Sequence, residues 1–321
     1  MNHDMRRQSQ SDIAPARTAD VLKHLGDSLN TQWRRYRKRL KRCQKRFSQN
    51  AVHDVRVEIR RLLSTIELLG AFIPERDVKK VRRALKRHLD TFDQLRDTQV
   101  QLGYVGRMAG AFPDAQAFYE WLRKREARFT RETRKAVKRI RTKRLGRRLA
   151  ALEKEIRRRR KQVTREQAFI IVRRAMNRAF ARVAQLCRHM RADDTRTIHR
   201  TRIAFKRFRY MIEALSPLLP AVTEDHRRAL RGYQCMMGDI QDMEVLLAAL
   251  DRFVQKEEVN AASARRLRNE LVRWRRMLIQ IYLNAAGRLR RFWPPSGLRQ
   301  PTQKRKIQAH ESLPASPRHR R

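Results

Sequence analysis

Glycine and proline, the residues that most often interrupt regular structure, are scarce in this sequence. The 321 residues include ten of each, and no proline occurs between Pro113 and Pro217. Proline cannot continue a helix and glycine weakens one. Their scarcity therefore excludes frequent interruptions and favours long helices.

Cysteine is scarcer still, with three residues at widely separated positions: Cys43, Cys187 and Cys235. No Cys-x-x-Cys pair occurs, so the sequence has no metal-binding or redox motif of that type. We expect the three side chains to lie at core positions of helices, as buried and reduced thiols of a cytoplasmic protein.

Long apolar runs are absent as well. No segment approaches the roughly 20 apolar residues that cross a bilayer. The first residues include Asp4 and Asp12 and lack the apolar core of a secretory signal. The sequence thus predicts neither secretion nor membrane insertion.

Acidic residues are few in relation to basic ones. The chain has 79 Lys and Arg against 32 Asp and Glu, a formal net charge of +47. A surface with this excess repels itself, and a polyanion such as nucleic acid, an anionic membrane or a phosphate polymer would relieve the repulsion. Hydrophobic residues still make up 41% of the chain, which is enough for a core and argues against wholesale disorder.

Apolar residues recur at spacings of three and four along nearly the whole chain, the pattern of amphipathic helices that pack side by side. The sequence therefore predicts an all-α fold. The predicted helices cover residues 15–48, 52–72, 76–106, 115–160, 165–191, 196–216, 222–256 and 261–292. Residues 1–14 are expected to form a disordered head, and residues 294–321 a disordered basic tail.

The chain is internally repeated. Residues 52–62 match residues 198–208 at every apolar position except Thr201, at an offset of 146 residues. After a one-residue deletion the match resumes, and Asp97 corresponds to Asp242. A duplicated helical unit usually pairs about a pseudo-two-fold axis, so that matching faces line one groove. We therefore expect two antiparallel four-helix bundles, residues 15–162 and 163–293, with a basic groove between them.

Both copies carry a row of histidine and basic residues on one helix face. In the first copy, His53, Arg56 and Arg60 are spaced i, i+3, i+7 and share a stripe beside the apolar seam. Arginine forms bidentate bonds to phosphate oxygens, and histidine gains charge beside phosphate. Such rows suit a chain phosphate polymer, and the duplication favours this function over a merely solvated face. The predicted polyphosphate-binding residues are His53, Arg56, Arg60, Arg61, His199, Arg202, Lys206 and Arg207.

Other predicted helices offer further basic residues that would extend the same surface. These possible contacts are Arg34, Arg37, Lys41, Arg83, Lys86, Arg178, Arg182, Arg228 and Arg231. The alternative is that they form ordinary solvated helix faces. The matched Asp97 and Asp242 are expected to pair with a nearby arginine and orient it, not to catalyse a reaction.

The stretch from Val52 to Arg61, Val-His-Asp-x-Arg-Val-x-x-Arg-Arg, resembles the hallmark of the CHAD family, the conserved histidine α-helical domain. The stretch from Ile198 to Tyr210 resembles the second histidine helix of that family. Residues 95–97 resemble its Leu-x-x-Arg-Asp element, although Gln241 replaces the arginine in the second copy.

The resemblance covers residues 15–293 and implies a pair of four-helix bundles with a basic cavity between them. It also implies polyphosphate binding by the predicted residues and, in bacterial members, association with polyphosphate granules. Some members are fused to a triphosphatase module that bears Glu-x-Glu-x-Lys. This chain lacks that spacing, so we expect a binding protein without enzymatic activity.

Three alternatives remain open. A nucleic-acid-binding protein fits the net charge, but aromatic residues are only 7% of the chain, and stacking platforms for single strands are not apparent. An enzyme or metalloprotein would need a nucleophile, a glycine-rich phosphate loop or a His-x-x-x-His companion, and none is found. We accordingly expect no cofactor and no metal. The third alternative is a helical scaffold that is targeted by its charge. Nothing in the sequence specifies an oligomeric state.

Overall fold

A computed structural model describes residues 20–108, 113–256 and 261–294. This part of the chain is all-helical and contains no strand, as the sequence predicts. The expected head and, apart from Pro294, the expected tail lie outside the described residues. The helices are α3 (Val21–Lys45), α4 (Gln49–Leu69), α5 (Glu75–Asp90), α6 (Asp93–Gly106), α7 (Pro113–Arg139), α8 (Lys143–Gln162), α9 (Arg165–Arg188), α10 (Thr195–Leu215), α11 (Glu224–Lys256) and α12 (Ala261–Ala285), with 3-10 turns η1 (Ser216–Leu218) and η2 (Ala286–Arg291).

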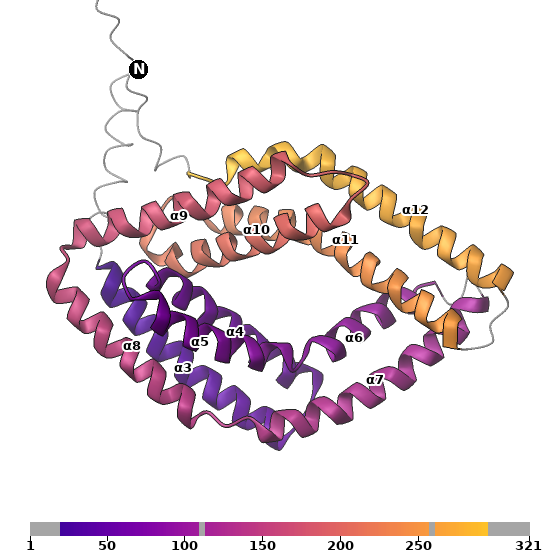
Figure 1. The fold of residues 1–321 in the computed structure, drawn as a ribbon, viewed down its shortest axis with the longest axis horizontal. Helices are drawn as coiled ribbons and strands as arrows, with labels where there is room; N and C mark the ends of the chain where they lie inside the picture. Colours follow the sequence, from indigo (N-terminus) through magenta and orange to yellow (C-terminus); the bar gives the residue numbers. More distant parts are fainter. Residues whose placement is uncertain (1–19, 109–112, 257–260, 295–321) are drawn as a thin grey trace, which may run out of the picture.

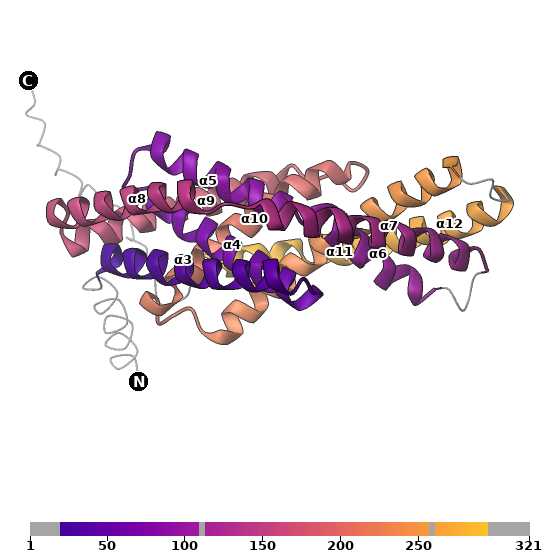
Figure 2. The same cartoon turned by 90° about the horizontal axis from the view of Figure 1, so that it is seen from below.

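The helices form a flat, elongated ring (Figures 1 and 2). Helices of the first copy, α3 to α8, make up the lower half of the view in Figure 1, and α9 to α12 make up the upper half. The matched helices α4 and α10 pack against each other, and α6 packs against α11. These four are the inner helices, which border the middle of the ring (Figure 1).

The duplication is visible in the helices that carry the predicted rows. Helices α4 and α10 both have 21 residues, and both of their ends are related by the sequence offset of the repeat. Each begins at a side-chain cap, since the Ser48 hydroxyl accepts from the Ala51 N–H and the Asp194 carboxylate accepts from the Arg196 N–H. Matched residues of the two rows therefore lie at the same distance from the first residue of their helix.

Two long predicted helices are each divided in two. The segment 76–106 breaks after Asp90, where Phe92 turns into the core and is completely buried. The segment 115–160 breaks between Arg139 and Lys143, where the Gln44 side-chain amide donates to the carbonyls of Val137 and Ile140. Neither break contains proline or glycine. They depend on burial and on a tertiary cap, and the helical periodicity gave no sign of them.

The buried side chains do not divide at the expected boundary between residues 162 and 163. One cluster joins α3, α4, α5 and α8 to α9, α10, the first half of α11 and the end of α12. The other joins α6 and α7 to the second half of α11 and to α12. Each cluster therefore takes side chains from both copies, and neither copy has a core of its own.

The expectation of three buried cysteines is only partly correct. Cys43 is buried, Cys187 is half-buried and Cys235 is exposed on α11. The expectation is wrong for Cys235 because its position faces away from the seam formed by Tyr233 and Met237. Among the described helices, none is long and apolar enough to cross a membrane.

Candidate polyanion-binding site

Four of the predicted binding residues come together where α4 packs against α10. We call Arg56 and Arg60 of α4, with Arg202 and Lys206 of α10, the central cationic cluster. Each of the other three cations acts electrostatically on Lys206, and Arg60 acts on Arg56. The predicted rows of the two copies thus meet at a single place.

Burial makes this cluster energetically unusual. The Lys206 pKa falls from 10.5 to about 7, mainly because the ammonium is desolvated and then because of Arg60, Arg202, Arg56 and Arg209. Arg56 is only 8% exposed, and burial followed by the charge of Arg60 lowers its pKa as well. Positive charge at this site is disfavoured until an anion joins it.

The site also contains buried polar atoms without hydrogen-bond partners. The Nε atoms of Arg60 and Arg202 are buried and have no hydrogen-bond partner, and neither does Nδ1 of His199. Buried polar atoms in folded proteins are nearly always paired. Unpaired guanidinium donors on both α4 and α10 are what an oxyanion ligand would satisfy.

Carboxylates of α6 and α11 lie close to the central cationic cluster. Asp93 of α6 bonds Arg56 at 3.2 Å. Asp242 acts electrostatically on Asp97, and both carboxylates are coupled to Arg202. Desolvation, the largest cause, raises the pKa of each of these two aspartates. The expected basic groove is therefore a mixed site, in which cations from α4 and α10 face carboxylates from α6 and α11.

The sequence predicts that Asp97 and Asp242 pair with a nearby arginine, but the direct ion pair is formed by a different aspartate. Asp97 and Asp242 are coupled to arginines by charge, but the direct bond to Arg56 comes from Asp93. The sequence comparison missed Asp93 because Gly238 occupies the matching position of the second copy.

The two histidines differ in their surroundings. His53 lies one turn before Arg56 and is exposed. His199 is half-buried and lines a hollow of about 660 Å³ together with Arg196, Arg200 and Glu244. The histidine pair is therefore matched in sequence but not in environment.

Arg61 and Arg207 do not join the central cationic cluster. Both are exposed, and each has a carboxylate partner, Glu58 for Arg61 and Glu67 for Arg207. Arg207 instead lines a separate hollow of about 710 Å³, which also contains the predicted contacts Arg178 and Arg182 of α9.

The remaining predicted contacts lie on exposed faces of α3, α5 and α11, and within the described part of the chain no hydrogen bond or ion pair joins them to the central cationic cluster. On α11, Arg228 pairs with Asp225 at 3.4 Å and Arg231 with Glu224 at 2.5 Å. The exposed residues of α3 and α5 in this group are Arg34, Arg37, Lys41, Arg83 and Lys86.

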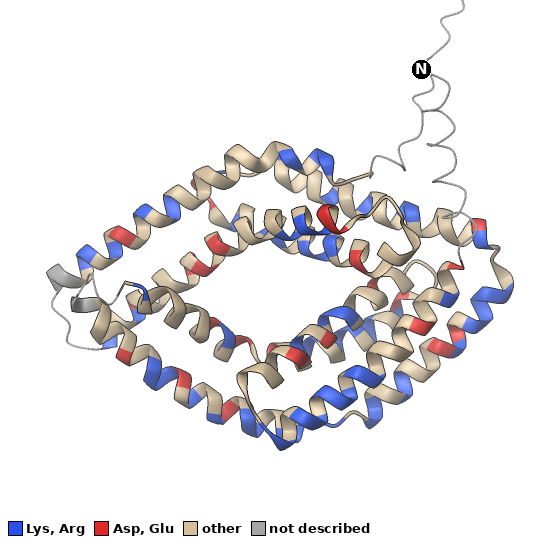
Figure 3. Ribbon diagram, turned by 180° about the vertical axis from the view of Figure 1, so that it is seen from behind, with Lys and Arg blue, Asp and Glu red and all other residues tan. Residues whose placement is uncertain are grey.

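The net positive charge of the chain lies mainly on the outer helices. Helix α3 has nine Lys and Arg against one Asp, and α8 has ten against two Glu. The inner helix α11 has five against six acidic residues. Figure 3 shows the same trend, with basic residues crowded on outer helices and acidic ones more frequent inside the ring.

Two further cations at the site were not predicted. Arg209 is 7% exposed and donates a hydrogen bond to Gln234 at 2.7 Å. The matching position of the first copy is Leu63, so the repeat does not identify Arg209. Arg96 acts on Arg56 and Asp242 from α6, and Gln241 matches it. The prediction of the main binding residues relied on duplicated positions and therefore included neither side chain.

Within the described residues, no group of three or more His, Cys, Asp or Glu is placed to hold a metal ion. A family model for the CHAD domain matches residues 28–251. The chain belongs to the CHAD domain family.

Solved structures show the same fold at low sequence identity. The CHAD domain from the plant Ricinus communis is 18% identical, with a TM-score of 0.63 over 84% of this chain and 92% of that one. PptA from Streptomyces chartreusis is 15% identical, with a TM-score of 0.61 over 85% of this chain and 100% of that one. No curated protein matches the sequence. This CHAD domain therefore shares its helical architecture with proteins whose sequences have diverged widely.

Proposed function

We propose that this CHAD domain binds inorganic polyphosphate without catalysing its hydrolysis, and that both copies of the repeat contribute to one site. The observation that carries the proposal is the central cationic cluster. Like charges from α4 and α10 are held together, with Lys206 at a pKa of about 7 and with unpaired guanidinium donors. A polymer with a negative charge on every unit would neutralise the cations and pair the donors.

The mixed character of the site favours a polymer of high charge density. Asp93, Asp97 and Asp242 already offset part of the positive charge. An anion must therefore compete with these carboxylates, which a weakly charged ligand would do poorly. A thin phosphate chain can reach partly buried guanidinium groups that a wide duplex would meet only at their edges.

Nucleic acid is the second candidate, supported by the net charge of +47. Yet among the described residues no Phe, Trp or Tyr side chain is exposed. Single-stranded nucleic acid is usually held by bases that stack on aromatic side chains. The surface therefore supports contact with phosphate groups better than recognition of bases. Association with polyphosphate granules is part of the proposal and would follow from polymer binding.

The test compares three double variants of the full chain. Arg56→Ala with Arg60→Ala removes the cations of α4, and Arg202→Ala with Lys206→Ala removes those of α10. The matched control, Arg61→Ala with Arg207→Ala, removes the same charge from exposed positions of the same two helices. A charge-assisted hydrogen bond contributes about 1.5–3 kcal/mol, so each central pair should weaken long-chain binding by more than about tenfold. The control should change it by less than about twofold.

Affinity is measured at physiological salt, and circular dichroism verifies that each variant remains helical. Equal losses in all three variants would mean that diffuse charge, and not the cluster, binds the polymer. Polyphosphate should also displace labelled duplex DNA at equal phosphate concentration, and the reverse result would favour nucleic acid. Release of phosphate from long-chain polyphosphate, measured with and without Mg²⁺, would overturn the non-enzymatic part of the proposal.

A further inference from the structure

A second concentration of cations lies on the outside of the ring, in a hollow between the start of α5 and the length of α8. We call it the outer hollow, and its volume is about 720 Å³. Its charged lining residues are six cations and two carboxylates: Arg76, Lys80, Arg144, Arg147, Arg148 and Arg158, with Asp77 and Glu155. Sites of roughly 300–1,000 Å³ are typical of small ligands.

The packing of α8 fixes this arrangement. Leu145, Leu149 and Leu152 are buried, and α8 packs against both α3 and α5. A Cβ at Gly146 would lie 3.2 Å from the Trp33 ring, so α8 approaches α3 closely at this turn. Residues next to the buried seam are consequently held beside α5.

Few of these cations are neutralised. Arg158 is bonded to Glu155 at 2.7 Å, and Arg76 lies 3.7 Å from Asp77. Arg148 donates to the Lys80 backbone carbonyl at 3.3 Å. Among the described residues, the side chains of Lys80, Arg144 and Arg147 have no ion-pair or hydrogen-bond partner. Several unneutralised cations thus line one concave surface, an arrangement that repels itself without an anion.

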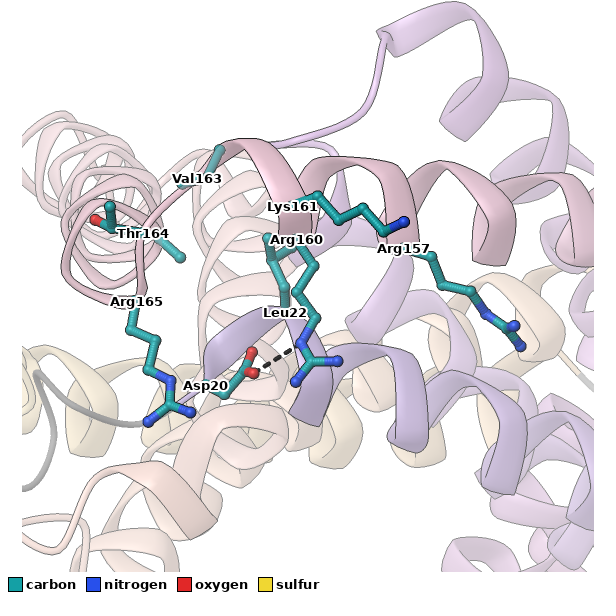
Figure 4. A pocket seen from close by; sticks show the side chains of 9 residues that line it. Asp20, Leu22, Arg157, Arg160, Lys161, Val163, Thr164 and Arg165 are labelled. Carbon is teal, nitrogen blue, oxygen red and sulfur yellow. Dashed lines mark hydrogen bonds and ion pairs between the residues drawn. The ribbon is translucent and has the colours of Figure 1, made fainter.

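The opposite end of α8 provides a contrast (Figure 4). In the hollow at the α8–α9 turn, Arg160 bonds Asp20 at 2.7 Å. The Asp20 carboxylate is also coupled to Arg165, and Arg157 is engaged by Glu153 at 2.5 Å. Carboxylates of the chain already satisfy much of this hollow, whereas the outer hollow has no carboxylate for Lys80, Arg144 or Arg147.

The described residues of the second copy contain no helix that matches α8. In the first copy, the helix α7 is followed by the 20-residue helix α8. In the second copy, α12 is followed by the six-residue turn η2. Among the described residues, a site built on α8 therefore has no counterpart in the second copy, and its residues are different from those of the central cationic cluster.

We propose that the outer hollow is a second binding site for condensed phosphate, so that one molecule holds two stretches of polyphosphate at once. The guanidinium groups of α8 and the Lys80 ammonium would bind the phosphate oxygens of a short stretch of polymer. This proposal rests on the proposed function of the central cationic cluster. Its consequence is that the protein joins polymer chains to one another in addition to binding them.

The experiment is a calorimetric titration of the full chain with tripolyphosphate, a probe too short to reach both sites. The wild-type protein should bind two molecules. The variant Arg144→Ala/Arg147→Ala/Arg148→Ala should bind one, and so should Arg202→Ala/Lys206→Ala. The control variant Arg34→Ala/Arg37→Ala/Lys41→Ala loses the same charge as the α8 variant from the exposed surface of α3 and should keep both sites. Circular dichroism verifies folding.

The outcomes separate the two proposals. A single site that is lost only in the central variant would overturn the outer site and leave the proposed function standing. A single site lost only in the α8 variant would instead overturn the central site. If the α3 and α8 variants weaken tripolyphosphate binding equally, the outer hollow acts only through diffuse charge and is not a specific site. If the α8 variant no longer binds duplex DNA but still binds two molecules of tripolyphosphate, the surface binds nucleic acid and the proposal is wrong.

Discussion

Lys206 provides a direct test of how burial and ligand binding are connected. Its pKa is lowered from 10.5 to about 7 by desolvation and by neighbouring cations, Arg60 first among them. A polyanion beside the ammonium should raise this pKa again, because it stabilises the charged form. Binding is then accompanied by proton uptake, and affinity must depend on pH.

The magnitude follows from linkage. The contribution from protonation is fully present below the pKa of the free protein and is lost as pH rises through the pKa of the complex. If binding raises the pKa from about 7 to about 8, affinity should fall about eightfold between pH 6 and pH 9. A larger rise on binding gives a steeper fall.

Two substitutions isolate this effect. Lys206→Arg keeps the positive charge at every pH in this range, so the part of the pH dependence of affinity that comes from residue 206 should disappear. Lys206→Met removes the charge and should weaken binding at pH 6. Since charging Lys206 in the folded protein costs on the order of several kcal/mol, Lys206→Met should also raise the unfolding free energy at pH 6. That gain should shrink as pH rises from 7 towards 10.5. Over this range Lys206 is already neutral in the folded wild type, whereas the unfolded chain gradually loses its proton, so the free-energy difference between the two states disappears.

The assay is the affinity for fluorescent long-chain polyphosphate at constant ionic strength from pH 6 to pH 9. Calorimetry in buffers of different ionisation enthalpy measures proton uptake directly. Histidine titration is common to wild type and Lys206→Arg, so the difference between their profiles belongs to Lys206. Identical pH profiles for the two proteins would refute the reasoning.

Two other predictions concern charge and packing. Asp97→Asn and Asp242→Asn each remove a carboxylate coupled to Arg202, and should strengthen polyphosphate binding by up to about fivefold, on the order of 1 kcal/mol. The gain should disappear at a pH below the carboxyl pKa, and unchanged affinity at pH 8 would contradict the coupling. Phe118 is completely buried beside Phe253, with ring centroids 5.3 Å apart. Phe118→Ala should lower the unfolding free energy by about 3–5 kcal/mol in urea denaturation, and a loss below about 1 kcal/mol would show that this end of the ring packs loosely.

The helices and the rows on α4 and α10 could be predicted from the sequence because both depend on local periodicity. Residues at i, i+3 and i+7 share a helix face in any fold, and the repeat identified Arg56 with Arg202. The predicted resemblance to the CHAD family is confirmed by the family match over residues 28–251. Polyphosphate binding, the non-enzymatic character and the residue contacts stay predictions.

The distribution of charge could not be predicted in the same way. From the sequence, Arg60 and Arg61 are adjacent cations, but Arg60 has a buried unpaired Nε whereas Arg61 is exposed and bonded to Glu58. Adjacent helical positions point about 100° apart, and only the packing partners decide which direction is buried.

The sequence by itself determined the all-helical character, the duplication and the excess of basic residues, because each is read from the pattern of residues along the chain. The tertiary structure decided that Asp93 would bond Arg56, that Lys206 would lose its hydration, and that Lys80 would join Arg144 and Arg147 in one hollow. These are relations between residues far apart in sequence. Their energies depend on distance and on exclusion of water, which arise only when the helices pack.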